Sequence, residues 1–185
     1  MNDDIVIEST RRWISEVVIG LNLCPFARRV MMDAKIRYVV SEASEPDALL
    51  ADLARELAAL VDDADAVIET TLIIHPHLFA DFLDYNDFLA DADEHLSMLG
   101  YEGIIQIASF HPQYRFADTK PNAVENYTNR SPYAMLHLLR ESSVSAVVDY
   151  PGGLEAIPKR NIAALRKLGL TTMRAKLKDL EMGTE

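Results

Sequence analysis

Apolar and polar positions recur along this chain with two periods, one typical of strands and one typical of helices. The strand period, or an unbroken β-branched run, covers residues 35–41, 67–74 and 103–110, and a fourth strand is expected at 144–150. Apolar residues at helical spacing predict helices at residues 8–21, 46–61, 78–99, 132–141, 158–168 and 171–180. A short helix is expected directly after Cys24, because Pro25 suits a first helical position.

The order strand, helix, strand, helix, strand indicates the fold class. Crossovers of this length permit parallel pairing of the strands they connect. We therefore expect a single α/β domain, residues 1–185, with a mixed and mainly parallel sheet of about four strands and helices packed on it. Residues 151–185 would form a helical C-terminal appendage. The alternative is an α+β two-layer sandwich of the ferredoxin-like kind.

Composition narrows the possible partners. The 185 residues include 29 acidic and 18 basic side chains, a net charge of −11. That balance argues against binding a nucleic-acid backbone or an anionic membrane. The first residues lack the pattern of a signal peptide, and no apolar run reaches the roughly 18 residues that span a bilayer. With a single cysteine, the chain is predicted to be cytoplasmic. The sequence leaves the oligomeric state open.

The long stretch 109–141 is the expected functional region. Loops of more than about 12–15 residues in compact domains are usually functional or disordered. This one is rich in aromatic, Arg, Asn and His residues, unlike a linker. Ser131 and Pro132 would start a helix whose free N–H groups, beside Arg130, suit a carboxylate or phosphate. The candidate substrate-binding residues are Tyr114, Arg115, Asn126, Tyr127, Asn129, Arg130 and Ser131.

Two of the expected strands end on a His-Pro pair. His75 and His111 would emerge at the same end of the sheet if their strands run parallel, and His77 lies two residues from His75. Three imidazoles with an open position suit zinc or non-haem iron. The spacing is not specific, and the alternative is that these histidines bond to the backbone where the strands end.

Two further side chains are candidates for catalysis. Cys24 at a helix N-cap would have a lowered pKa and could act as a nucleophile, although a lone cysteine is commonly a small buried apolar residue. His137 and Glu141 lie four residues apart on the helix expected at 132–141, so His137 could be a general base oriented by Glu141. The alternative for that helix face is an ordinary solvated surface.

Several segments resemble one known family. They are NLCPFA at 22–27, IHPH at 74–77, DFLDYNDFL at 81–89, ASFHPQYRF at 108–116 and ENYTNRSPYAMLHLLRE at 125–141. Together these segments closely resemble DUF1415, a bacterial family of domains of unknown function. The resemblance implies a single soluble bacterial domain. It implies no activity, cofactor or catalytic residue.

Three functional hypotheses follow from the residues. The first is an enzyme acting on a small anionic metabolite, which Arg115, Arg130 and Ser131 would hold while a cleft containing Cys24, His75 and His111 supplied the chemistry. The second is a non-catalytic module that binds a metabolite or a metal. The third is a protein-interaction domain that uses the basic C-terminal helices and the aromatic loop.

Overall fold

The computed structural model of the chain describes residues 2–63, 65–145 and 156–181. A four-stranded sheet lies at its centre, with the strand order β1-β2-β4-β3. The strands are β1 (Ile36–Val40), β2 (Thr70–Ile74), β3 (Ile105–Phe110) and β4 (Met135–Arg140). β1 and β2 are parallel, whereas β4 runs antiparallel to both of its neighbours, β2 and β3.

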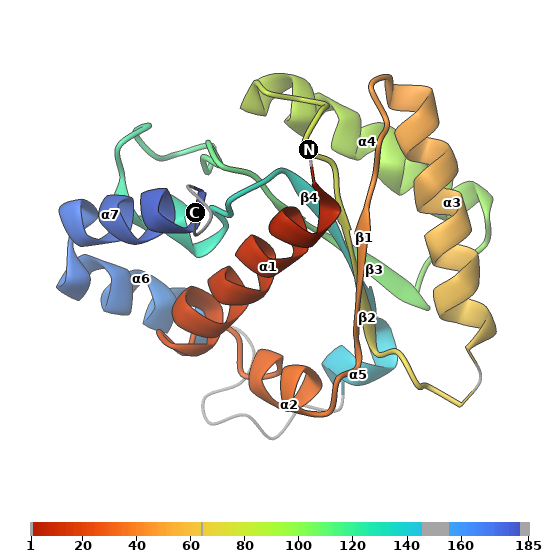
Figure 1. Ribbon diagram of the computed structural model, residues 1–185, viewed down its shortest axis with the longest axis horizontal. Coiled ribbons are helices and arrows are strands. Elements are labelled where there is room, and N and C mark those ends of the chain that lie inside the picture. Colours follow the sequence, from red (N-terminus) through yellow and green to blue (C-terminus); the bar gives the residue numbers. More distant parts are fainter. Residues whose placement is uncertain (1, 64, 146–155, 182–185) are drawn as a thin grey trace.

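Helices cover both faces of the sheet (Figure 1). One face carries α3 (Pro46–Asp62) and α4 (Phe82–Met98). The other carries α1 (Asp3–Trp13), the π-helix Ile14–Ile19, α2 (Ala27–Met32), α6 (Ala156–Leu168) and α7 (Leu170–Glu181). The 3-10 turn Val124–Thr128 lies in the loop before β4, and α5 (Glu141–Ser145) follows β4.

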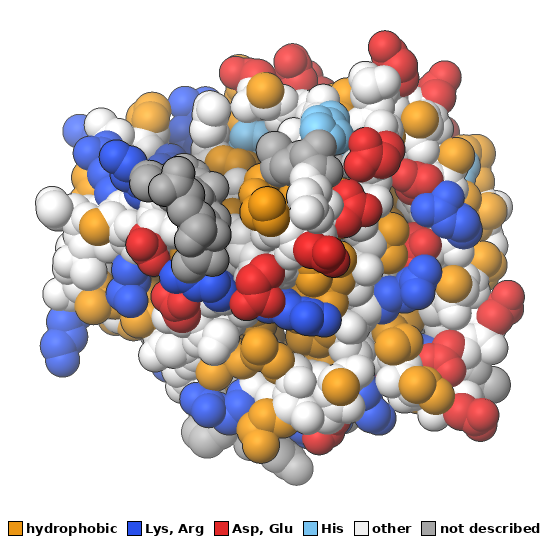
Figure 2. Space-filling model, in the orientation of Figure 1, with side chains coloured by type: hydrophobic (Ala, Val, Ile, Leu, Met, Phe, Trp, Pro, Cys, Tyr) orange, Lys and Arg blue, Asp and Glu red, His pale blue; other side chains and the backbone are white. Residues whose placement is uncertain are grey.

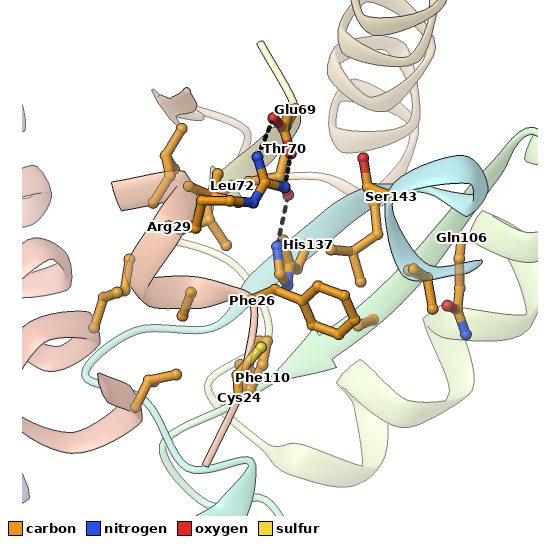
Figure 3. A pocket seen from close by; sticks show the side chains of 18 of the residues that line it. Cys24, Phe26, Arg29, Glu69, Thr70, Leu72, Gln106, Phe110, His137 and Ser143 are labelled. Carbon is orange, nitrogen blue, oxygen red and sulfur yellow. Dashed lines mark hydrogen bonds and ion pairs between the residues drawn. The ribbon is translucent and has the colours of Figure 1, made fainter. Parts of the chain in front are cut away.

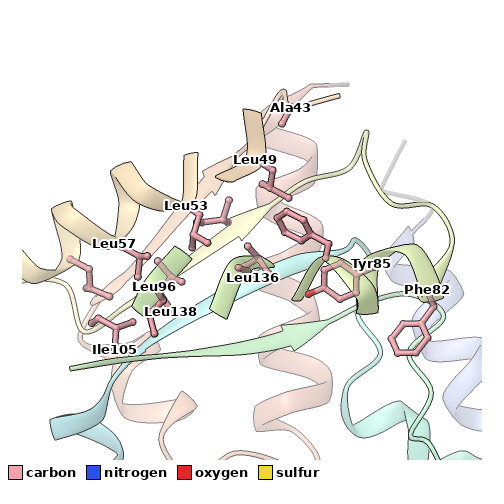
Figure 4. Packing of buried hydrophobic residues seen from close by; sticks show 14 residues of the cluster. Ala43, Leu49, Leu53, Leu57, Phe82, Tyr85, Leu96, Ile105, Leu136 and Leu138 are labelled. Atoms are coloured by element: carbon pink, nitrogen blue, oxygen red, sulfur yellow. The ribbon is translucent and has the colours of Figure 1, made fainter. Parts of the chain in front are cut away.

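The core under α3 and α4 follows from the spacing of large apolar residues. Leu49, Leu53 and Leu57 recur every four residues, so they form one stripe along α3 and are all fully buried. They meet Tyr85 of α4 and Leu136 of β4 above the sheet (Figure 4). Burial of each leucine contributes roughly 1.5–3 kcal/mol. The Tyr85 hydroxyl donates a 2.8 Å hydrogen bond to the Met135 carbonyl, which fixes α4 over the sheet.

The core on the opposite face includes the C-terminal helices. Trp13 from α1 and Ile74 from β2 pack in one cluster with Leu165, Met173 and Leu180 of α6 and α7. Leu165 and Leu180 are fully buried there. The described part of the segment expected to be an appendage, residues 156–181, is therefore part of the main hydrophobic core.

The predicted α/β class, with one domain and a mixed sheet of four strands, is confirmed. The expectation of mainly parallel pairing is wrong, since one pair is parallel and two are antiparallel. The reason is that β4 inserts between β2 and β3, which run in the same direction without touching. The two-layer sandwich is excluded because helices lie on both faces of the sheet.

The helix expected at 132–141 is also wrong, because residues 135–140 form β4. Met135 and His137 face the α1 side while Leu136 and Leu138 face α4, so both faces of this strand are covered. A strand covered on both faces reads as a continuous apolar run, which periodicity cannot distinguish from a buried helix. Of the strand expected at 144–150, residues 144 and 145 belong to α5 and the others lie outside the described residues.

The remaining elements lie close to their predicted places, with shifted ends. The first helix starts earlier, at Asp3, and continues through the π-helix to Ile19. The second strand is shorter than expected and begins at Thr70. The helix expected from residue 78 begins at Phe82, because Phe79 has a φ of 59° and breaks the helical backbone. Among the described residues, no helix is long and apolar enough to cross a bilayer.

Candidate functional site

A cavity of about 260 Å³ lies between the sheet and the helices α1 and α2 (Figure 3). Its floor is made by residues that share one face of three strands: Thr70 and Leu72 of β2, Ala108 of β3, and His137 and Leu139 of β4. This grouping follows from the two-residue period of a strand. The apolar walls include Trp13, Ile14, Val18, Phe26, Val30, Ile36 and Phe110.

His137 is the polar group at the centre of this floor. Its Nε2 lies 2.7 Å from the Thr70 hydroxyl, which in turn lies 2.6 Å from the Leu138 carbonyl. A carbonyl can only accept, so the single hydroxyl proton of Thr70 is donated to Leu138 and Thr70 accepts from Nε2–H. Nδ1 therefore carries a lone pair, and no hydrogen bond to it occurs among the described residues.

The protonation of His137 follows from its surroundings. The protein around the ring lowers its pKa to about 4, because burial penalises the charged form. The imidazole is therefore neutral at neutral pH. The expected pairing with Glu141 does not form, because residues four apart are neighbours on a helix but not on a strand, and Glu141 belongs to α5.

Cys24 lines the same cavity, so two of the candidate catalytic residues, Cys24 and His137, are brought together. Burial raises the pKa of the Cys24 thiol, and hydrogen bonds from the backbone N–H groups of Phe26 and Ala27 lower it by less. The expected activated thiolate is thus wrong, because α2 begins only at Ala27 and burial outweighs the helix start. Cys24 and His137 both lie in the described part of the chain, and no hydrogen bond joins them.

An ion pair lies at one side of the cavity. Both carboxylate oxygens of Glu69 accept from Arg29, at 2.7 and 2.5 Å, and the Lys35 ammonium lies 3.1 Å away. The guanidinium lowers the pKa of Glu69 to about 2. Sequence reasoning did not assign these residues to a site. The available signal was Glu69 itself, the one charge within the apolar run 67–74.

His75 and His111 lie on the opposite face of the sheet. They leave parallel strands at the same end, as expected, and both rings pack on Tyr85, with centroid distances of 5.5 and 5.2 Å. The Nε2–H of His111 donates to the Phe79 carbonyl at 2.9 Å, and its Nδ1 accepts from the Gln113 N–H at 3.0 Å. Both nitrogens of His111 are therefore used by the backbone.

His75 is bonded on one side only. Its Nδ1 lies 3.3 Å from the Leu78 carbonyl, and its Nε2 is buried without a partner. Burial lowers the pKa of His75 to about 4 and also lowers that of His111. Both rings are thus enclosed and neutral, which matches the backbone-bonding alternative.

The expected zinc or iron ligands do not converge. The Nε2 of His77 lies near the exposed carboxylate of Glu42, at 3.8 Å, while the rings of His75 and His111 are enclosed in the core. Among the described residues, no group of three or more His, Cys, Asp or Glu side chains is arranged to hold a metal. The physical reason is that β2 ends at Ile74 and residues 76 and 77 form a turn, so the strand alternation that would keep His77 on the same side as His75 does not continue.

The long loop is held by its own side chains. The Arg130 guanidinium donates to the carbonyls of Tyr114 and Pro121 and lies 4.6 Å above the Tyr127 ring. Asn126 accepts from the Phe116 N–H and the Thr119 hydroxyl and donates to the Lys120 carbonyl.

Two more of the candidate substrate-binding residues have structural partners. The Asn129 amide donates to the Ser109 carbonyl, which holds the loop against β3. The Ser131 hydroxyl donates to the Tyr133 carbonyl instead of capping a helix. Its expected role at a helix start is therefore wrong, since β4 follows it.

A second recess, of about 330 Å³, lies at the start of α4 and is more polar. Its lining includes Asp81, Gln113, Arg115 and Arg130. His111 lies close enough that Asp81 raises its pKa and Arg130 lowers it. Of the anion-binding candidates, Arg115 and Arg130 are therefore brought together here, on the side of the sheet away from Cys24.

These observations define an α/β protein with a helix layer on each face of a mixed sheet and an apolar cavity under one layer. Residues 5–175 match the family described as "Protein of unknown function (DUF1415)", so the chain belongs to this family, as its motifs indicated. Comparison with curated proteins and with solved structures gives no match.

Proposed function

We propose that this protein binds a small, uncharged and largely apolar molecule in the cavity between the sheet and α1 and α2. The observation that carries this proposal is an apolar cavity whose floor presents His137 Nδ1, a hydrogen-bond acceptor that has no partner among the residues the structure describes. Ligand pockets in proteins are typically concave and apolar, with few polar groups that orient the ligand. The proposal corresponds to the hypothesis of a non-catalytic binding module. The binding site is this cavity, however, and not the long stretch 109–141.

The size of the cavity bounds its ligand. At about 260 Å³ it lies just below the range of about 300–1,000 Å³ that is typical for drug-sized ligands. An engineered apolar cavity of about 150 Å³ accepts benzene. A single ring with one or two substituents matches this volume.

The charges around the cavity favour an uncharged ligand. Glu69 pairs with two cations, Arg29 and Lys35, and the carboxylate of Asp33 lies 3.9 Å from Arg29, so two negative and two positive charges balance at this side of the cavity. An ionised ligand in the apolar part would therefore lack a counter-charge, and burial of an unpaired charge is strongly unfavourable. This replaces the anionic ligand expected from the sequence with a neutral one at this site.

Titration with toluene tests the proposal. Toluene should raise the melting temperature and shift the NMR signals of residues such as Ala108 and Leu139, because it binds the folded state only. Ala108→Leu fills the cavity and should weaken toluene binding at least about tenfold. Ala90→Leu, the same change at an exposed position of α4, is the matched control and should leave binding unchanged.

The NMR map of the unmodified protein decides the question even if Ala108→Leu does not fold. Toluene at saturating concentration with no shift at the cavity-lining residues would contradict the proposal. Shifts confined to other surfaces would contradict it equally.

An anion site is the second candidate, favoured by the recess that Arg115 and Arg130 share. Inorganic phosphate should then raise the melting temperature, and Arg115→Gln should abolish that rise. Arg28→Gln, at an exposed position of α2, is the control.

An enzyme with the full set of catalytic residues expected from the sequence would need Cys24 beside His75 and His111, but the sheet separates Cys24 from the two histidines.

One observation favours the hypothesis of a protein-interaction domain. Lys and Arg side chains gather over α6 and α7 (Figure 2), and α6 carries Lys159, Arg160, Arg166 and Lys167 without an acidic residue. Part of this charge is already used within the molecule, since Arg166 pairs with Glu125 and Arg174 donates to Asn122. The apolar cavity therefore has the stronger support.

A further inference from the structure

We infer that the ligand of this cavity is recognised as a hydrogen-bond donor, so that it belongs to the class of flat, ring-sized molecules with a neutral O–H or N–H group, such as phenols. The donor would be placed on His137 Nδ1. This inference rests on the proposed function, and it specifies which neutral molecules the site selects.

The sheet fixes the direction of the hydrogen bond. β2 and β4 are paired with Thr70 opposite Leu139, which places the Thr70 hydroxyl between the His137 ring and the Leu138 carbonyl. The Thr70 hydroxyl has one proton, which it donates in the hydrogen bond to the Leu138 carbonyl. His137 must therefore hold its own proton on Nε2 and present a lone pair at Nδ1. A ligand with an O–H or N–H group can donate to this acceptor, whereas the carbonyl or ether oxygen of a ligand cannot form a hydrogen bond with it.

Most other polar groups around the cavity already have partners. The Trp13 Nε1–H donates to the Arg130 carbonyl at 3.0 Å, and Thr70 is bonded on both sides. Both carboxylate oxygens of Glu69 already accept from Arg29. In Figure 3 the Ser143 hydroxyl and the Gln106 amide point away from His137. Among the described lining residues, His137 Nδ1 is thus the acceptor that a ligand can reach on the floor.

The walls favour a flat body for the ligand. Trp13 and Phe110 meet edge to face with centroids 5.1 Å apart, and the Phe110 centroid lies 5.9 Å from that of His137. Phe26 is a further wall of the same cavity. Aromatic side chains prefer offset or edge-to-face contact with another ring. A ring that bears one donor can therefore pack against the aromatic walls and donate a hydrogen bond to His137 at the same time.

Phenol and toluene, which differ by a hydroxyl in place of a methyl group, test this inference as probes. Their dissociation constants are measured for the unmodified protein and for His137→Phe, which keeps a ring of similar size but has no acceptor. Because toluene leaves water more readily, the relevant quantity is the ratio of the two constants. Loss of Nδ1 should shift that ratio about tenfold in favour of toluene.

Thr70→Val gives a second test if His137→Phe does not fold. The variant removes the hydroxyl that holds the proton on Nε2, so the ratio should again shift toward toluene. A readout on the histidine itself separates recognition from a general structural effect. In the unmodified protein the ¹⁵N resonance of His137 Nδ1 should be that of an unprotonated nitrogen, and phenol, but not toluene, should shift it.

The outcomes distinguish this inference from the proposed function. If both probes bind the cavity while the ratio is the same in both variants and phenol leaves Nδ1 unshifted, the inference is overturned and the proposed function stands. If neither probe binds the cavity, the proposed function fails and the inference fails with it. A ratio that shifts in both variants, with phenol shifting Nδ1, supports both.

Discussion

His75 shows what burial does to a single titratable residue. The ring lies in the core beside Tyr85 and Phe79, with Nδ1 on the Leu78 carbonyl and Nε2 without a partner. A proton added to Nε2 would create a buried cation and a donor with nothing to bond to. This is why burial holds the pKa of His75 at about 4, below its ordinary value of 6.5.

The stability of the fold should therefore fall in mild acid. Between pH 6.5 and about 4 the unfolded chain binds a proton at His75 and the folded protein does not, so the free energy of unfolding decreases as pH falls through this window. The contribution of one histidine is up to about 1.4 kcal/mol per pH unit. His137 contributes in the same direction. Urea denaturation at several pH values between 7 and 4 measures the decrease.

His75→Phe isolates the part due to this ring. The substitution keeps an aromatic ring beside Tyr85 and removes the titration, so the loss of stability between pH 6.5 and 4 should shrink by about 1–3 kcal/mol. His95→Phe makes the same substitution at a partly exposed position of α4 and is the matched control. An unchanged pH profile in His75→Phe would contradict the assignment.

For these histidines, the sequence predicted where the side chains lie better than it predicted what they bind. His75 and His111 do emerge at one end of the sheet, because both follow strands reached by similar crossovers. Their partners could not be predicted, since the Phe79 and Leu78 carbonyls come from the turn that a positive φ at Phe79 creates. The bonding of His137 depends on Thr70, which becomes its neighbour only when β2 and β4 pair.

At the scale of elements, the loop between β3 and β4 is ordered by side chains that look like binding residues. Asn126 is fully buried and makes three hydrogen bonds to the loop, at Phe116, Thr119 and Lys120. Its composition of Asn, Arg and aromatic residues suits this internal role as well as it suits a ligand. Composition alone does not separate the two uses, whereas the hydrogen-bond partners do.

Asn126→Ala should therefore loosen the loop. It leaves the Phe116 N–H without its partner and removes one of the two hydrogen bonds to the Lys120 carbonyl, whose other donor is the Ala123 N–H, at a cost of about 1–3 kcal/mol in the free energy of unfolding. Limited proteolysis should then cut within residues 112–128 at a faster rate. Asn122→Ala, an exposed position of the same loop, is the control and should change stability by less than about 0.5 kcal/mol. Equal effects of the two changes would show that Asn126 does not hold the loop.

β4 is the element that the sequence could not assign. Its residues Met135, Leu136, Leu138 and Leu139 are apolar on both sides of the strand, as a strand between two helix layers requires. The preceding Ser131-Pro132 pair also matches a helix start. Only pairing with β2 and β3, which are distant in the sequence, selects the extended form.

At the scale of the whole molecule, the C-terminal helices complete the hydrophobic core on the cavity side. Leu165 of α6 and Leu180 of α7 are fully buried with Trp13 and Ile74, and the Ser9 hydroxyl of α1 donates to the Leu180 carbonyl. The helices were predicted from their periodicity. Their place in the core was not, because a short amphipathic helix gives no indication of which face of a sheet it covers.

Leu165→Ala tests this placement. Removal of a fully buried leucine side chain from a packed core should lower the free energy of unfolding by about 2–5 kcal/mol, measured by urea denaturation. Leu83→Ala, on a residue that is 56% exposed, is the matched control and should stay within about 0.5 kcal/mol. A cost at Leu165 no larger than that at Leu83 would mean that α6 and α7 are dispensable for the fold.

The insertion of β4 between β2 and β3 has a consequence for how the chain folds during synthesis. Within the described residues, β3 pairs only with β4, so after residue 110 emerges from the ribosome its strand has no partner until residues 135–140 follow. β2 likewise keeps one open edge over that interval. Unpaired strand edges are prone to intermolecular pairing, and non-local pairing slows folding. Nascent chains that end between residues 110 and 135 should therefore be the ones that most need protection from aggregation.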